Sequence, residues 1–147
     1  MQETPQELSA RAILPALRGL IARELVKGHR FTHQRAAKLL GLSRPAVTLY
    51  ARGHRGRAID LRHRDDVLLI VRDMAGGLAS GELDSRALMV RLDSAASYVL
   101  RRGYACALHQ EIDPGLKGSG CDLCMTSPRP CSYFHPWRPS GAPRGTA

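Results

Sequence analysis

The chain has 147 residues, a net charge of +9, a pI near 10.1 and 44% hydrophobic residues. This length suits one small domain or a domain with an appendage, and this apolar content is enough to form a buried core. The apolar runs are short and interrupted by charge, so no membrane-spanning helix is expected. The polar N-terminus, MQETPQEL, lacks the apolar stretch of a secretory signal, so we expect a cytoplasmic protein.

The positive charge is concentrated in the first part of the chain. Residues 1–60 contain eleven Lys and Arg against four Asp and Glu, whereas residues 61–147 contain eleven against nine. Phosphate groups attract such a basic region, although a small basic protein can also be asymmetric by chance. The asymmetry favours a nucleic-acid partner that binds the first sixty residues.

Helices are expected from the N-terminus onward. Thr4, Pro5 and Glu7 form the pattern of a helix start with a capping box. Pro15 predicts a kink or two consecutive helices, and Gly28 is the predicted end of the segment. The apolar stripe with helical spacing consists of Ile13, Leu14, Leu17, Leu20, Ile21 and Leu25.

Two short helices, 32–40 and 44–52, are predicted within the sequence HQRAAKLLGLSRPAVTLYAR, residues 33–52. Ala37 is small where the helices would cross, and Gly41 can adopt the positive φ of a tight turn. The predicted buried set is completed by Ala36, Leu40, Leu42, Val47 and Tyr50. A buried amphipathic helix pair could imitate part of this pattern. The joint placement favours a helix-turn-helix, whose second helix enters the DNA major groove.

The start of the second of these helices has its own signals. Ser43 is a good N-cap residue, and Pro45 is tolerated in a first helical turn. A basic, glycine-containing loop, residues 53–57, follows the second helix directly. This loop is a candidate for contacts with phosphate groups.

Two longer helices are expected after the basic loop. The first covers residues 62–75 and is expected to end at Gly76-Gly77, and the second runs from about Leu83 to Arg102. Their predicted inward side chains are Val67, Leu68, Ile70, Val71 and Met74 on the first, and Leu88, Met89, Leu92, Ala96, Val99 and Leu100 on the second. No strand alternation or internal repeat is visible, so the expected fold class is all-α.

Four segments are predicted along the chain. Residues 1–60 form a helix-turn-helix DNA-binding domain, and residues 61–102 form a helical core and dimerisation segment. Residues 103–137 form a cysteine-rich metal-binding segment without helical periodicity. Residues 138–147 are expected to be a disordered tail.

All four cysteines lie in the third segment, as Cys106, Cys121, Cys124 and Cys131, with the spacing C-x14-C-x2-C-x6-C. Cysteines in a loop-rich part of a cytosolic chain favour a metal site over disulfides. Four thiolates suit Zn²⁺ or an iron–sulfur cluster. Single cysteines around one C-x2-C pair favour the iron–sulfur cluster.

Other interpretations of the cysteines stay open. Zn²⁺ could be held by Cys121, Cys124, Cys131 and His135. The cysteines could also be unligated, with Cys106 as a small buried hydrophobe, or the C-x2-C pair could act as a dithiol switch. His109 could support or replace a ligand, although we expect it at the surface. The aromatic residues Tyr104, Tyr133, Phe134 and Trp137 are expected to shield the site from water.

The sequence contains no pattern typical of an enzyme. Asp65, Asp66 and Asp73 fit a solvated helix face better than a catalytic carboxylate set. No nucleophile elbow, P-loop or dinucleotide fingerprint is present. We therefore expect neither catalysis nor a small-molecule substrate.

Residues 12–60 resemble the phage-repressor-like (XRE/Cro-type) DNA-binding domains. The segments AILPALRGLIARELV and AAKLLGLSRPAVTLYARGHRG, with cysteines towards the C-terminus, resemble a small prokaryotic subgroup of transcriptional regulators. The resemblance implies a lambda-repressor-like fold and a dimeric transcription factor. His33 differs from the family pattern, which often has a glutamine that helps to bind a phosphate or a base at this position. Ser94–Tyr98 also lacks a further C-x2-C pair that some relatives carry.

The expected complex is a homodimer on a double-stranded, pseudo-palindromic DNA operator, with recognition helices about 34 Å apart. The residues expected to face the bases are Ser43, Arg44, Pro45, Thr48 and Leu49. The residues expected to hold phosphates are Arg52, His54, Arg55 and Arg57, and His33 and Gln34 complete the predicted contact set. Arg44 could bind guanine through its two-pronged donor group.

The predicted function is transcriptional regulation, with operator binding modulated by an iron–sulfur cluster that senses redox state, oxygen or cluster status. One alternative is a helix-turn-helix regulator with a purely structural zinc site, including an antitoxin-like interaction module. Another is a thiol or electron-transfer protein that uses the C-x2-C pair. The thiol alternative leaves the pattern of residues 33–52 unexplained.

Overall fold

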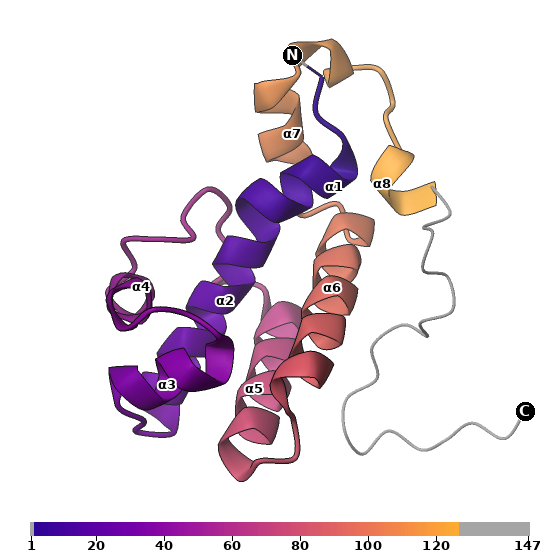
Figure 1. The fold of residues 1–147 in the computed structure, drawn as a ribbon. Coiled ribbons are helices and arrows are strands. Elements are labelled where there is room, and N and C mark those ends of the chain that lie inside the picture. Colours follow the sequence, from indigo (N-terminus) through magenta and orange to yellow (C-terminus); the bar gives the residue numbers. More distant parts are fainter. Residues whose placement is uncertain (1, 127–147) are drawn as a thin grey trace, which may run out of the picture.

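The structure, a computed structural model, describes residues 2–126. These residues form helices and connecting loops, and no strand occurs among them, which confirms the all-α prediction (Figure 1). Between Gln2 and Thr126, every helix is too short or too polar to cross a lipid bilayer. Several predictions lie outside the described residues: those for Cys131, Tyr133, Phe134, His135, Trp137 and the tail 138–147.

The chain begins with a nearly continuous helical segment. Its parts are α1 (Pro5–Leu8), the π-helical turn η1 (Ser9–Ile13), α2 (Leu14–Arg23) and the π-helical turn η2 (Glu24–Gly28). The predicted capping box is present, because Thr4 and Glu7 bond to each other's backbone N–H groups. Pro15 follows the change from π-helix to α-helix. Proline has no N–H to donate, and a wider turn before it accommodates the missing hydrogen bond.

The predicted helix pair is confirmed as α3 (His33–Leu40) and α4 (Arg44–Ala51). Gly41 ends α3 with a φ of 63°, a conformation that glycine adopts without steric cost. Ser43 caps α4, since its Oγ accepts the Ala46 N–H at 3.2 Å. The conformation of Gly41 and the cap at Ser43 therefore account for the turn, as the sequence predicts.

The next helix, α5 (Asp65–Ser80), is longer than predicted because it continues through Gly76-Gly77. Each interior glycine costs about 1 kcal/mol relative to alanine, but the helix still buries Ala75 and Leu78 around this point. A Cβ atom on Gly77 would lie 3.1 Å from the Leu83 Cβ, so glycine permits the returning chain to approach closely. The helix ends instead at Gly81, whose φ is 81°.

Helix α6 (Ser85–Arg101) follows, with Asp84 as its N-cap, and confirms the second long helix. Most of the predicted inward residues of α5 and α6 are buried, and Leu68 is half-buried. Met89 is the exception, since 63% of its surface is exposed. Helical spacing places Met89 at the border of the apolar stripe, and that position turns away from the core.

One connected hydrophobic core runs from Leu8 to Cys124. Helix α2 is its centre, because it packs against α4 on one side and against α5 and α6 on the other. Figure 1 shows α2 between the α3–α4 pair and the α5–α6 pair. The helix-turn-helix is therefore mounted on the same core as the two longer helices.

The cysteine-rich part contains helices that its composition did not predict. They are α7 (Cys106–Ile112), a 3-10 turn (Pro114–Leu116) and α8 (Leu123–Thr126). The prediction of a surface position for His109 is also wrong, since this residue is only 5% exposed. His109 Nε2 lies 2.7 Å from the Glu3 carbonyl oxygen, which connects α7 to the segment before α1. Such short helices depend on tertiary contacts rather than on periodicity.

Candidate nucleic-acid interface

Helix α4 has one face packed against the core and one face in solvent. Val47 and Tyr50 are buried on the inner side, where Tyr50 lies beside Gly19 of α2. The residues predicted to contact bases lie along the other side, exposed except for the half-buried Thr48: Ser43, Arg44, Pro45, Thr48 and Leu49. The outer face of α4 is therefore accessible to a major groove about 12 Å wide.

A hydrogen bond joins the two helices at this face. His33 Nδ1, at the start of α3, lies 2.8 Å from Thr48 Oγ1 on α4. The Thr48 hydroxyl donates its proton to the Arg44 carbonyl oxygen at 3.1 Å. With that proton engaged, the tautomer of His33 that carries a proton on Nδ1 can donate it to Thr48 Oγ1. His33 is half-buried and bonded to α4, and the neighbouring predicted residue Gln34 is exposed.

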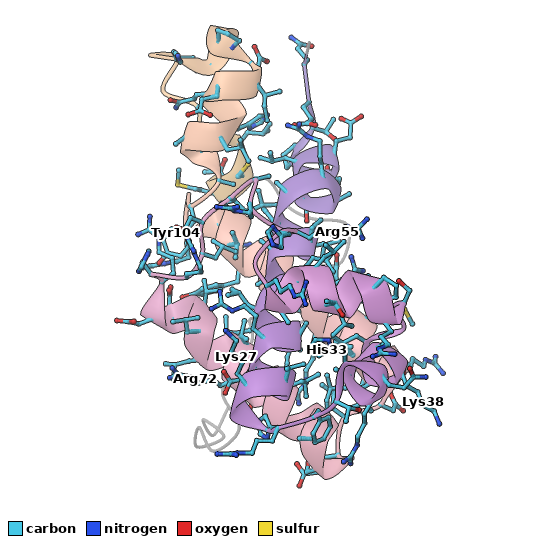
Figure 2. The ribbon with its side chains drawn as sticks, turned by 90° about the vertical axis from the view of Figure 1, so that its left-hand side faces the viewer. Lys27, His33, Lys38, Arg55, Arg72 and Tyr104 are labelled. Carbon is cyan, nitrogen blue, oxygen red and sulfur yellow. The ribbon has the colours of Figure 1, made fainter. Side chains whose placement is uncertain are left out.

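A cavity of about 780 Å³ lies next to α4, between α2 and the loop of residues 52–62. We call it the basic groove. One wall carries Arg23 at the end of α2 and Lys27 in η2, and the apolar lining includes Leu20, Tyr50 and Ile59. The loop wall carries four arginines: Arg52, Arg55, Arg57 and Arg62. Figure 2 shows this side of the molecule, with Lys27, His33 and Arg55 labelled.

The loop wall is held against α2 by a close backbone contact. Gly56 has a φ of +72°, and a Cβ atom at this position would lie 2.6 Å from the Pro15 carbonyl oxygen. A second close contact joins α2 and α4, since a Cβ on Gly19 would lie 3.1 Å from Tyr50 Cδ1. The two glycines therefore permit the loop and α4 to approach α2, which sets the width of the basic groove.

Among the described residues, one cation of the basic groove has an acidic partner. This is Arg62, whose Nε and Nη2 lie 2.9 and 2.8 Å from the Asp60 carboxylate oxygens. The hydrogen bonds from the Arg62 side chain and backbone N–H hold the pKa of Asp60 well below its ordinary value. Among residues 2–126, no ion pair involves the other five groove cations: Arg23, Lys27, Arg52, Arg55 and Arg57.

The structure brings three of the four predicted phosphate-binding residues into the basic groove. Arg52, Arg55 and Arg57 line it, whereas His54 is exposed outside it. The sequence prediction missed Arg23 and Lys27. They are four residues apart and so share one helix face, but only the fold places that face opposite the loop. A helix-spaced pair of cations upstream of the motif is the signal that could have found them.

The described cysteines share a pocket that lies away from this surface. Cys106, Cys121 and Cys124 line it together with His109 and Met125. In the part of the chain that the structure describes, no three His, Cys, Asp or Glu side chains are grouped so that they could hold a metal ion. The three thiols therefore do not fit a complete metal site by themselves. The fourth predicted ligand, Cys131, lies outside the described residues.

The predicted solvated acidic face of α5 is only partly correct, because two of its three carboxylates have specific partners. Asp66 Oδ2 accepts hydrogen bonds from the Tyr98 and Tyr104 hydroxyls, both at 2.7 Å. Asp73 lies 2.7 Å from Arg91 Nη1 on α6. Tyr104 was expected to shield the cysteines, but its hydroxyl is bound to α5.

The contacts of Asp66 shift two pKa values, that of Asp66 itself and that of Tyr98. Burial raises the pKa of Asp66, but hydrogen bonds from Tyr98, Tyr104 and the Val67 N–H outweigh it and leave the pKa lowered. The hydrogen bond to Asp66, assisted by burial, raises the pKa of Tyr98 to about 12. This network joins α5 to the end of α6 and stabilises the scaffold behind the helix-turn-helix.

Comparison with models of known protein families, with curated proteins and with solved structures finds no match to this chain.

Proposed function

We propose that this protein is a sequence-specific, DNA-binding transcriptional regulator with a lambda-repressor-like helix-turn-helix. The observation that carries the proposal is the exposed outer face of α4 beside a groove whose five cations, Arg23, Lys27, Arg52, Arg55 and Arg57, form no ion pair within residues 2–126. Arg44 lies in the first turn of the exposed face, where its fork of donors can bind guanine O6 and N7. The groove cations supply the salt-dependent attraction to phosphates that positions such a helix.

The protein is further proposed to act as a cytoplasmic homodimer. Regulators with this helix pair bind two half-sites about 34 Å apart, which requires two copies. Large apolar side chains remain exposed on the two long helices: Leu69 on α5, and Met89 and Val90 on α6. Burial of such side chains stabilises subunit contacts.

The cysteine pocket is proposed to modulate DNA binding. Cys124 belongs to the continuous core, and α8 packs against α6. A change at the thiols can therefore influence the helices that support α4. The predicted iron–sulfur cluster stays a proposal, with zinc as the alternative, because the described residues do not form a complete ligand set.

Selection of binding sites from a random duplex library tests the proposed function. The purified full-length protein should recover a consensus with two related half-sites about one helical turn apart. Equal binding of all duplexes, weakened uniformly by salt, would overturn sequence-specific recognition. Sedimentation of the complex at low DNA concentration would establish whether two copies bind each site.

A further inference from the structure

The basic groove has a composition that favours a negatively charged occupant. Five cations without an ion-pair partner in the described part of the chain share one hollow, and the nearby carboxylate of Asp60 is already bound to Arg62. A second hollow of about 250 Å³ adjoins the groove and adds Arg72, with Glu24 as its acidic residue. Like charges that face one cavity repel each other, and a bound anion removes this repulsion.

The size and apolar lining of the basic groove indicate what kind of anion fits. Its volume of about 780 Å³ lies in the range of about 300–1,000 Å³ that is typical of small-molecule sites. An inorganic phosphate would fill only a small part of it. Leu20, Tyr50 and Ile59 provide apolar surface among the cations, which suits a ligand with both a phosphoryl group and a flat or apolar part.

Arginines are well suited to hold phosphoryl groups, because their planar fork of donors matches the phosphate oxygens. The groove presents Arg23 on the α2 wall and Arg55 and Arg57 on the loop wall. Lys27, in η2, adds a compact positive charge to the same wall as Arg23. A ligand between these walls can therefore be held from two sides.

We propose that the basic groove binds a phosphorylated small molecule of nucleotide size. Binding would use the loop cations that a DNA backbone also needs, so ligand and DNA would compete for Arg52, Arg55 and Arg57. The competition rests on the proposed function, whereas ligand binding itself does not. The protein would then respond to a phosphorylated metabolite at a site separate from the cysteine pocket.

Calorimetric titration of the full-length protein with ATP, inorganic pyrophosphate and uncharged adenosine tests ligand binding. ATP is expected to bind more tightly than pyrophosphate, and adenosine only weakly. The variant R23Q/K27Q should weaken ATP binding at least tenfold. The matched control R86Q/R101Q removes two exposed charges from α6, far along the chain from the groove. This control should change the ATP affinity less than twofold. Equal losses in both variants would overturn the proposal, because they indicate non-specific attraction.

The phosphate that the groove binds could belong to a small molecule or to the DNA backbone. Titration of the same variants with a random-sequence DNA duplex separates these two sources. If R23Q/K27Q weakens ATP binding tenfold and DNA binding less than threefold, the groove is a small-molecule site. If the wild type binds neither ATP nor pyrophosphate and R23Q/K27Q weakens DNA binding, the groove belongs to the DNA backbone and the proposal is wrong. ATP binding without any DNA binding would support the ligand site and remove the proposed function instead. R55Q provides a second groove variant, and thermal melting confirms that each variant folds.

Discussion

A hydrogen bond of 2.8 Å joins His33 Nδ1 on α3 to Thr48 Oγ1 on α4. This bond fixes the first residue of one helix to the outer face of the next. His33→Ala should lower the free energy of unfolding by about 0.5–1.5 kcal/mol, because the hydrogen bond to Thr48 is lost. His33→Gln, whose side-chain amide can donate or accept, should recover part of the loss. Urea denaturation of both variants measures the difference, and an unchanged stability of His33→Ala would show that the bond contributes nothing.

Arg44 and Arg55 are expected to contribute differently to DNA binding. Arg44→Ala should relax the preference at one base pair by about 1–3 kcal/mol, because a bidentate base contact is lost. Arg55→Ala should weaken all sequences alike and reduce the salt slope by about 1. Fluorescence anisotropy with the selected site and its single-base variants measures both. Uniform losses from both variants would contradict this division.

Gly56 and Gly53 form a matched pair for testing the loop contact. Both have a positive φ, of +72° and +74°, but only a Cβ on Gly56 would collide with the Pro15 carbonyl oxygen. Alanine at either position should cost about 1–2 kcal/mol in backbone strain. Gly56→Ala should cost about 1–3 kcal/mol more, because the overpacked backbone must move. Thermal melting compares the two, and equal costs would refute the close contact as the cause.

Tyr98 should titrate abnormally because of Asp66. Its hydroxyl should deprotonate near pH 12, as measured by ultraviolet absorbance against Tyr98→Phe. A raised pKa stabilises the fold fully below about pH 10, and this contribution is lost as the pH rises towards 12. Asp66→Asn should return the Tyr98 pKa towards 10. An unchanged pKa in that variant would exclude Asp66 as the cause.

The contribution of Asp66 to fold stability depends on pH in the opposite sense, because it is lost at low pH. Its lowered pKa means that it stabilises the fold above about pH 4, and this contribution is lost as the pH falls further. The free energy of unfolding of Asp66→Asn, measured by urea denaturation at several pH values, should therefore fall less steeply below pH 4 than that of the wild type. Identical pH profiles would contradict the network.

Metal analysis of anaerobically purified protein tests the cysteine prediction. An iron–sulfur cluster should give a brown protein with broad visible absorption, iron and acid-labile sulfide. Cys106→Ser should abolish the colour if this cysteine is a ligand. A colourless protein with one equivalent of zinc would overturn the cluster and favour the zinc alternative.

The sequence alone predicted the features that depend on neighbouring residues. Ser43 caps α4, Gly41 forms the left-handed turn and Thr4 with Glu7 forms the capping box, because each acts within three or four residues. The exposed face of α4 follows from the same helical spacing. These elements are built from local backbone chemistry, so periodicity and caps were sufficient.

Only the tertiary structure decided the features that join distant residues. Packing carries α5 through Gly76-Gly77, and the contact with Glu3 buries His109. The basic groove exists because Gly56 brings the loop close to α2, which places Arg23 and Lys27 opposite Arg55. Such pairings depend on the energy of contacts between segments far apart in the chain, and no local pattern encodes them. The sequence alone therefore determined the α3–α4 helix pair, and the fold determined the charged cavity beside it.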